Sequence, residues 1–385
     1  MQVAELAEIL HQGEDSRHQF KVNITNADSL ASEMVAFSNC LGGKIFVGVR
    51  DDGTVQGLTS EDIRRLNLLV SNSASQHMNP VINPLTEIVT HPDGKVLIIS
   101  VEEGINKPYM DRGGVVWVKS GADKRRATSR EELQRLFAQA GLVHADEMPV
   151  KGMGVDQLDL PYFEAFFERR YGVPLPQELS LEQVLSNLNL TRNGCLNYAG
   201  ALLFGKNPQY QLPTCIVKAV AFVGTEIEGQ QYIDSRDIGG KLSDIFLQTI
   251  SFLLNNIRAV QGNQSFNSLG QPEIPRIVLE ELVANALIHR DYLISAPVRV
   301  LIFADRIEII SPGHLPNHLT VENIKAGNSN MRNPILASFA GATLPYRGLG
   351  SGILRVLKEW PQTEFIDDRN GNLFKVIIRR PVIVI

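Results

Sequence analysis

The chain has 385 residues, of which 44% are hydrophobic and 21% are charged, and its formal net charge at pH 7 is −5. This length provides enough apolar surface for a buried core and predicts two or three domains. The net negative charge excludes a protein that binds nucleic acid through its overall charge, so any such contact must come from a local basic patch.

Cysteine usage and hydropathy indicate the compartment. Cys40, Cys195 and Cys215 lie far apart without metal-ligand spacing, which is typical of free thiols in a reducing cytosol. No apolar run approaches the roughly 20 residues needed to span a bilayer. The amphipathic N-terminal segment contains acids and lacks the basic lead of a signal peptide. We therefore expect a cytoplasmic protein with no membrane contact.

Residues 1–140 predict a mixed α/β domain. A helix is expected around residues 29–39, followed by a buried strand over 44–49. Turn residues then separate two strands of a hairpin, over 87–90 and 95–101. A strand over 115–118 follows, and the domain closes with a helix from residue 131, where Ser129 and Glu132 predict a capping box.

The end of this domain carries a concentration of positive charge. This basic segment, residues 112–130, contains six basic residues and one acid, Asp123. The basic residues are Arg112, Lys119, Lys124, Arg125, Arg126 and Arg130. Together with Trp117 and Tyr109, such a stripe can follow phosphates and stack a base, which predicts a nucleic-acid-binding surface. The alternative is a solvated hairpin edge that charge protects from aggregation.

Residues 141–265 predict a small α/β middle region punctuated by glycine and proline, with a helix over 181–188 and a strand over 201–204. Residues 262–270 are the clearest flexible joint. The segment 200–207 is one residue short of a P-loop, but its interior is apolar and Asn207 replaces the hydroxyl residue that binds Mg2+. We therefore expect no P-loop in this region.

Residues 266–385 predict a nucleotide-binding domain. An apolar helix carries Glu281 and Asn285, which lie on the same face because they are four residues apart. Glu281 can polarise a water molecule, and the Asn285 oxygen can hold a hard cation such as Mg2+. His289 and Asp291 follow directly and are candidate ligand-binding residues. Taken alone, this spacing is also typical of a solvated helix face.

A second motif follows some sixty residues later, where three glycines lead into an apolar helix. The motif contains Arg347, Gly348, Gly350, Ser351 and Gly352. Exposed backbone N–H groups and the positive end of a helix favour phosphate at such a position. A glycine-rich loop is often only a tight turn, but the two motifs in this order predict a nucleotide site. Strands are expected over 298–303, 306–310 and 374–378.

The C-terminal motifs resemble those of the GHKL ATPase superfamily, which includes gyrase, the heat-shock chaperone, histidine kinases and mismatch-repair proteins. The resemblance implies a Bergerat-type α/β sandwich in which Glu281 is the general base and Asn285 binds Mg2+. It also places Gly348 to Gly352 on the phosphate lid.

The adenine-recognising box of that superfamily falls on residues 309–313, which include Ser311 and Gly313. Ser311 stands where the superfamily has an aspartate that accepts from the adenine amino group. A hydroxyl can also accept, but without a charge. Residues 311–313, together with residues 329–334 downstream, resemble a divergent branch found in bacterial RecG-like ATP-binding proteins.

The N-terminal domain resembles the Schlafen/Alba-like domain that accompanies this branch. The resemblance is carried by residues 13–21, 36–39, 42–53 and the closing basic segment. Nucleases of this type use two acids five residues apart and a third after a strand, which here fall on Glu14, Gln19 and Asp51. An amide cannot supply the negative charge that a two-carboxylate metal site needs, so we expect a vestigial nuclease site.

These resemblances favour an ATP-binding protein, with weak ATPase activity, whose nucleotide state controls binding of DNA or RNA. Transcriptional regulation or phage defence, and a homo-oligomeric state, fit the same resemblance. Two alternatives stay open at this point. One is a metal-dependent RNase or DNase, and the other is a structural oligomer that nucleotide assembles with little turnover.

Overall fold

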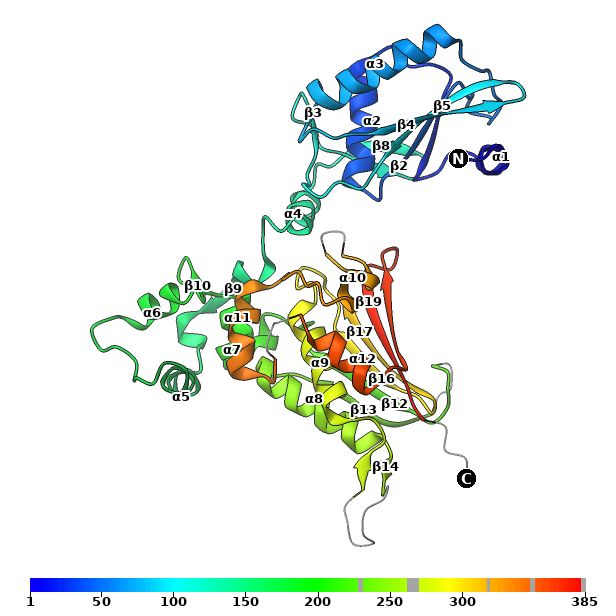
Figure 1. Cartoon of the computed structure of the whole chain (residues 1–385). Helices are drawn as coiled ribbons and strands as arrows, with labels where there is room; N and C mark the ends of the chain where they lie inside the picture. Colours follow the sequence, from blue (N-terminus) through cyan, green and yellow to red (C-terminus); the bar gives the residue numbers. More distant parts are fainter. Residues whose placement is uncertain (228–230, 262–269, 317–318, 347–349, 382–385) are drawn as a thin grey trace. The chain divides into compact units, whose positions relative to one another are not determined.

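In a computed structural model, residues 1–227, 231–261, 270–316, 319–346 and 350–381 are described, and the chain divides into two compact units, Met1–Leu142 and Val143–Ile385 (Figure 1). Within the described residues, no helix is both long and apolar enough to cross a membrane.

The helices and strands of the first unit, in chain order, are α1 (Val3–Gln12), β1 (His18–Lys21), α2 (Ala27–Asn39), β2 (Gly43–Val47), α3 (Ser60–Gln76), β3 (Met78–Asn79), β4 (Leu85–His91), β5 (Gly94–Val101), β6 (Met110–Asp111), β7 (Trp117–Ser120), β8 (Asp123–Arg126) and α4 (Arg130–Gln139). In the described part of this unit, four strands form a sheet in the order β1-β2-β5-β4, with β1 parallel to β2 and the other pairs antiparallel.

Alternating side chains give this sheet two buried faces. Ile45 and Val47 pack in a cluster with α2 and α3, whereas Phe46, between them, packs with Phe20 and with Leu6 of α1. Helices on both sides therefore hold β2 in the centre of the unit, as its continuous apolar sequence requires.

The hairpin formed by β7 and β8 lies against α2. The Asn39 amide donates to the backbone oxygens of Tyr109 and Trp117 at 2.9 and 2.8 Å, and the Tyr109 backbone N–H donates to Asn39 Oδ1 at 2.7 Å. On the far side of the hairpin, Val118 packs with Leu136 of α4. Alternate side chains of the hairpin thus point towards different helices.

The second unit contains η1 (Ala145–Glu147), β9 (Pro149–Gly154), η2 (Val155–Gln157), α5 (Leu160–Tyr171), α6 (Leu181–Asn187), β10 (Thr191–Arg192), β11 (Cys195–Asn197), α7 (Tyr198–Phe204), η3 (Pro208–Tyr210), β12 (Val217–Phe222), β13 (Tyr232–Ile238), α8 (Leu242–Asn256), β14 (Ala259–Val260), β15 (Gln271–Pro272), α9 (Arg276–His289), β16 (Val298–Ile302), β17 (Arg306–Pro312), α10 (Val321–Lys325), α11 (Pro334–Thr343), α12 (Gly352–Glu359), β18 (Thr363–Asp368) and β19 (Leu373–Arg379).

Among the described residues of this unit, six strands form one sheet in the order β13-β12-β16-β17-β19-β18. The helices α8, α9 and α12 lie on one face of it (Figure 1). Ile307 and Ile309 face these helices in the main core. β12 and β13 come from the segment that the sequence assigns to a middle region, yet they pair in this sheet. The mixed α/β class predicted from the sequence is confirmed.

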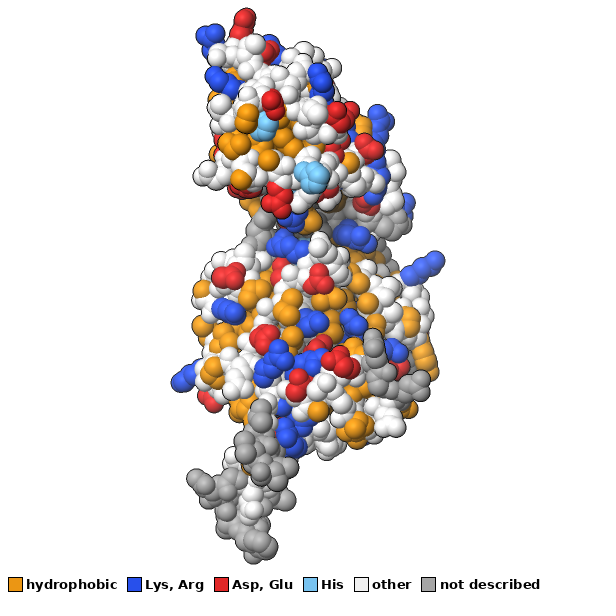
Figure 2. Space-filling model, turned by 90° about the vertical axis from the view of Figure 1, so that its right-hand side faces the viewer, with side chains coloured by type: hydrophobic (Ala, Val, Ile, Leu, Met, Phe, Trp, Pro, Cys, Tyr) orange, Lys and Arg blue, Asp and Glu red, His pale blue; other side chains and the backbone are white. Residues whose placement is uncertain are grey.

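The other face of this sheet carries ion pairs among apolar side chains. Glu308 on β17 contacts Arg306 at 2.7 Å and Lys375 of β19 at 3.7 Å. Glu364 of β18 similarly contacts Arg379 of β19 at 2.9 Å. Figure 2 shows the second unit with basic and acidic side chains intermingled rather than separated by sign.

The strand predicted over 201–204 is wrong, because these residues belong to helix α7. The Asn197 side chain caps this helix by accepting from the Gly200 N–H at 2.8 Å. Its residues 199–204 are all buried, so the helix shows no amphipathic pattern. A short apolar run of this kind does not distinguish a buried helix from a buried strand.

A buried carboxylate connects the start of the second unit to helix α11. Asp146 Oδ2 accepts from the backbone N–H groups of Ile335 and Leu336, at 2.7 and 2.9 Å, and so caps the helix. Its other oxygen is buried and has no recorded partner in the described part of the chain. Burial raises the pKa of Asp146 to about 6, against the opposing effect of the two N–H groups.

This raised pKa predicts a specific pH dependence of stability. The folded protein binds the Asp146 proton more tightly than the unfolded chain does. Its contribution to stability is therefore present below about pH 4 and is lost as the pH rises through about 6, by up to about 3 kcal/mol. Asp146→Asn keeps an acceptor oxygen and removes the titration. Urea unfolding between pH 4.5 and 7 should show a flatter profile for the variant, and parallel profiles would contradict this assignment.

Candidate functional site

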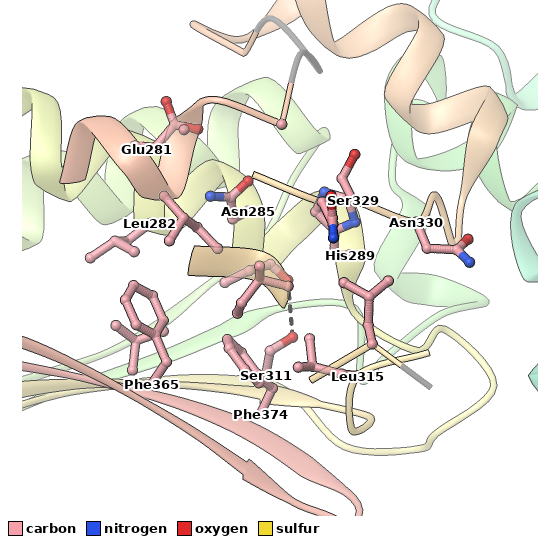
Figure 3. Close-up of a pocket in the computed structure, with 18 of the residues that line it drawn as sticks. Glu281, Leu282, Asn285, His289, Ser311, Leu315, Ser329, Asn330, Phe365 and Phe374 are labelled. Atoms are coloured by element: carbon pink, nitrogen blue, oxygen red, sulfur yellow. Dashed lines mark hydrogen bonds between the residues drawn. The ribbon is translucent and has the colours of Figure 1, made fainter. Parts of the chain in front are cut away.

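A pocket lies between α9, the strands β17 to β19 and the start of α12, with about 1040 Å³ of empty space that includes its open mouth (Figure 3). Its floor is apolar and its upper wall is polar. The apolar residues include Leu282, Ile309, Phe365, Phe374 and Val376, and the polar ones include Glu281, Asn285, His289, Ser311, Ser329 and Asn330. A flat apolar group can be buried at the floor while charged groups remain near the mouth.

Helix α9 places three of the predicted residues in this pocket. Glu281, Asn285 and His289 succeed one another at four-residue spacing, and all three line it. Most other residues of the helix are buried in the core, which fixes the rotation of the helix about its axis. Asn333 secures the end of α9, because its amide donates to the backbone oxygens of Ile288 and Arg290, both at 2.8 Å.

Glu281 is buried and is paired with a residue that the sequence did not indicate. Arg355 of α12 donates from Nη2 to Glu281 Oε2 at 2.7 Å. Burial raises the pKa of Glu281, while Arg355 and the Asn285 amide act in the opposite direction. The carboxylate also lies so close to Gly352 that any side chain there would overlap with Glu281 Oε1.

His289 provides a neutral polar group in the same wall. Its Nε2 lies 2.9 Å from the Tyr346 hydroxyl. Burial, aided by the charge of Arg332, lowers the pKa of His289 to about 4. Burial and the neighbouring Glu281 raise the pKa of Tyr346 to about 12. Both side chains are therefore uncharged at neutral pH.

Ser311 lies at the end of β17 and projects towards α9. Its hydroxyl donates to the Ala286 backbone oxygen at 3.1 Å, which is the dashed line in Figure 3. Because the only hydroxyl proton is used in this bond, the oxygen offers the pocket lone pairs alone. Ser311 is therefore placed to accept a hydrogen bond from a ligand.

The remaining predicted residues of the site differ in their positions. Gly313 lines the pocket, but Asp291 does not; its Oδ1 accepts from the Leu293 N–H at 2.9 Å. Gly350, Ser351 and Gly352 also line the pocket, and α12 begins at Gly352. Arg347 and Gly348 lie outside the described residues.

Sequence reasoning missed Arg355, Tyr346 and the loop residues 328–330, all of which line the pocket. A local signal existed for Arg355 alone, because it stands three residues after Gly352 and so one turn into the helix. Residues 329 and 330 belong to the segment that carries the RecG-like resemblance, but neither they nor Tyr346 show a pattern that assigns them to a ligand site, and only the tertiary fold brings them to α9.

The basic segment of the first unit is largely occupied by internal partners. Lys119 donates from Nζ to Gln19 Oε1 at 2.8 Å and to the Ala122 backbone oxygen, and burial lowers its pKa. Lys124 pairs with Glu33 of α2 at 2.8 Å. These two lysines therefore face the unit's own helix.

The four arginines of this segment lie differently. Arg112 pairs with Asp28 of α2 at 3.3 Å. Arg125 forms a two-point pair with Glu132 at 2.6 and 2.9 Å. The Arg126 guanidinium lies 5.3 Å from the centre of the Trp117 ring. For Arg126 and Arg130, both exposed, no ion pair is recorded within the described ranges. The predicted stripe is thus divided into paired cations and two exposed arginines.

The predicted nuclease residues are only partly brought together. Gln19 donates to Glu14 Oε1 at 2.6 Å, and the Phe20 backbone N–H donates to the same oxygen. Asp51 lies in an exposed turn after β2, and no contact from it to Glu14 is recorded in the described parts of the chain. The described residues contain no group of three His, Cys, Asp or Glu placed to hold a metal ion.

Comparison with known families gives one match in each of the two compact units. Residues 14–128 match the family model "Schlafen, AlbA_2". Residues 295–377 match the model "Putative ATP-dependent DNA helicase recG C-terminal". The chain joins a Schlafen AlbA_2 domain to a RecG-type ATPase-like domain. These domain types relate it to nucleotide binding and to nucleic acid.

Solved structures that are similar to the chain include the following two. The crystal structure of the DIP2311 protein from Corynebacterium diphtheriae has 22% identity and a TM-score of 0.44, covering 99% of this chain and 80% of that one. The solution structure titled the N-terminal domain of "Putative ATP-dependent DNA Helicase RecG-related Protein" from Nitrosomonas europaea has 20% identity and a TM-score of 0.24, covering 34% of this chain and 96% of that one. No significant match was found among curated proteins.

The contact between Gly352 and Glu281 yields a prediction about packing. Gly352→Ala should reduce the free energy of unfolding by about 1–3 kcal/mol, because its methyl group overlaps with the carboxylate. Gly224→Ala is the control, since a methyl group there meets open space. Urea unfolding should also show that Glu281→Ala reduces the cost of the Gly352 substitution. An equal cost in both backgrounds would contradict the contact.

Proposed function

We propose that this chain is an ATP-binding protein with slow ATPase activity, and that its nucleotide state controls nucleic-acid binding by the Schlafen AlbA_2 domain. The observation that carries the proposal is the pocket, in which an apolar floor with one hydrogen-bond acceptor adjoins a wall holding Glu281, Asn285 and the start of α12. This arrangement supports a base at the floor and phosphates at the wall.

The pocket's polarity supports adenine as the base. Phe365 and Phe374 offer apolar surface to a ring, and Ser311 offers an acceptor whose proton is committed to Ala286. Adenine has an amino group on its six-membered ring where guanine has a carbonyl oxygen. The Ser311 acceptor can pair with the adenine amino group but leaves the guanine carbonyl oxygen unpaired, which lowers the affinity for guanine.

Glu281 is the group best suited to the hydrolytic step. The oxygen of a water molecule bonds to the terminal phosphorus while the bond from that phosphorus to the bridging oxygen breaks. Glu281 takes the proton from the water, and the products are ADP and inorganic phosphate. The raised pKa of its buried carboxyl makes Glu281 a stronger base than an exposed glutamate.

Asn285 would hold Mg2+. Its amide hydrogen is directed to Glu281, which leaves the carbonyl oxygen for a cation. One protein oxygen fits Mg2+, which takes most of its shell from water and phosphate. When bound, the ion neutralises phosphate charge.

The exposed arginines support a nucleic-acid contact by the first unit, with Arg126 and Arg130 as its phosphate-binding groups. Regulation of transcription or defence against phage, by a homo-oligomer, is the role we propose for the coupled activities. The pairing of Lys119 with Gln19 does not favour the nuclease alternative, because an ammonium group and an amide stand where a metal site needs carboxylates.

Base selectivity tests the proposed nucleotide. The protein should bind ATP more tightly than GTP, and Ser311→Ala should weaken ATP binding roughly 2- to 10-fold by removing one neutral hydrogen bond. Ser338→Ala is a matched control, because that hydroxyl also donates to a helix carbonyl, Ile335 O at 2.8 Å, outside the pocket. Fluorescence titration measures the affinities of the wild-type protein and of both variants for ATP and GTP. Unchanged ATP affinity in the Ser311 variant would exclude this mode of binding.

The nucleic-acid surface is tested by two double variants that remove equal charge. Arg126→Ala with Arg130→Ala should weaken binding and reduce its salt dependence by up to about two phosphate contacts. Lys124→Ala with Arg125→Ala should affect binding less, since Glu33 and Glu132 already pair with these cations. Binding is measured by anisotropy over a range of salt concentrations. If the first pair has no effect, the segment is only a charged edge.

A further inference from the structure

We propose that Arg355 is the phosphate-binding cation of the pocket, and that it keeps Glu281 from acting as a base until a nucleotide's phosphates draw the guanidinium away. This inference rests on the proposed nucleotide-binding function and adds a residue and a control step to it. Three observations support it.

The first observation is the charge of the pocket. Arg355 is the only lysine or arginine among the described residues that line it. The two lining histidines do not add charge, because burial lowers the pKa of both His289 and His314. Among the residues that the structure describes, a polyphosphate entering the pocket therefore meets one cationic side chain.

The second observation is the unused hydrogen-bonding capacity of Arg355. A guanidinium has five N–H donors, and the one side-chain bond recorded for Arg355 is that from Nη2 to Glu281. Its Nε is buried and has no partner in the described structure. The side chain is nevertheless 39% exposed, whereas that of Glu281 is 8% exposed. Arg355 can thus turn to a ligand while Glu281 cannot leave the wall.

The third observation is that Arg355 and the start of α12 both lie against the Glu281 carboxylate. Arg355 holds Oε2, and Oε1 lies against Gly352 at the start of α12. While Arg355 holds Oε2, that oxygen is engaged with a cation rather than with an attacking water, and Gly352 limits the space beside Oε1.

Phosphate binding would reverse this state. Phosphate oxygens compete with the carboxylate for the guanidinium, since Arg forms strong charge-assisted bonds with either. Once Arg355 moves, Glu281 Oε2 loses the one side-chain partner recorded for it in the described chain and can accept from an attacking water. The other titratable group recorded beside Glu281 is Tyr346, which is neutral. The same event therefore frees the base.

Ligand binding to Arg355 variants tests the first half of the inference. Arg355→Ala should weaken ATP binding on the order of 10- to 100-fold while leaving adenosine binding within twofold, because only the phosphates contact this residue. Lys358→Ala is the control, as it removes an exposed charge from the same helix outside the pocket. Retained adenosine binding also shows that the variant is folded. Equal ATP affinity in Arg355→Ala and wild type would overturn the proposal.

Competition for the guanidinium tests the second half. Glu281→Gln keeps the shape of the side chain and removes the charge that holds Arg355, so ATP affinity should increase several-fold. This gain should disappear in the Arg355→Ala background. A gain that persists there would mean simple repulsion between Glu281 and phosphate, and no gain in either background would mean that the pair is only structural; either result overturns the proposal.

The proposed nucleotide-binding function and the proposed role of Arg355 predict different failures. If the wild-type protein binds neither ATP nor adenosine, the proposed function is wrong. If it binds both and the Arg355 variant binds ATP equally well, the pocket remains a nucleotide site and only the role of Arg355 is wrong.

Discussion

The ion pair between Glu281 and Arg355 is the interaction on which the pocket depends. An isolated carboxylate in the wall of an apolar helix is strongly unfavourable, so it requires a partner that arrives from elsewhere in the fold. Arg355 meets this need and ties α12 to α9. The close approach then disfavours a side chain at residue 352. With the two helices held in this way, Asn285 and His289 occupy the next turns of the same wall, above Ser311 and the aromatic floor.

Local patterns explain which parts of this site were predictable from the sequence. The helical repeat alone places Glu281 above Asn285, and the hairpin turn at His91–Gly94 alone defines β4 and β5. The Arg355 contact spans 74 residues of sequence, and no local pattern encodes it. Helix α7 was mistaken for a strand because a fully buried helix loses the periodicity that would reveal it.

The basic segment shows a different limit of sequence reasoning. A count of charges cannot indicate that alternate residues of a hairpin face opposite sides, or that Glu33 and Glu132 lie opposite Lys124 and Arg125. In both units a charge that looked available is in fact paired. The two pairs differ in the cost of breaking them. The pair with Glu132 is exposed and weak. In the pair with Arg355 the Glu281 carboxylate is buried, so the pair is broken favourably only when another anion binds the partly exposed guanidinium.

The central claim is that the pocket binds ATP through Ser311 and Arg355. Its most direct test is a crystal structure of the protein with Mg2+ and a non-hydrolysable ATP analogue. The account predicts the adenine amino group within hydrogen-bonding distance of Ser311 Oγ, and the Arg355 guanidinium on the phosphates rather than on Glu281. An analogue bound elsewhere, or bound in this pocket with the Glu281–Arg355 pair intact, would contradict it.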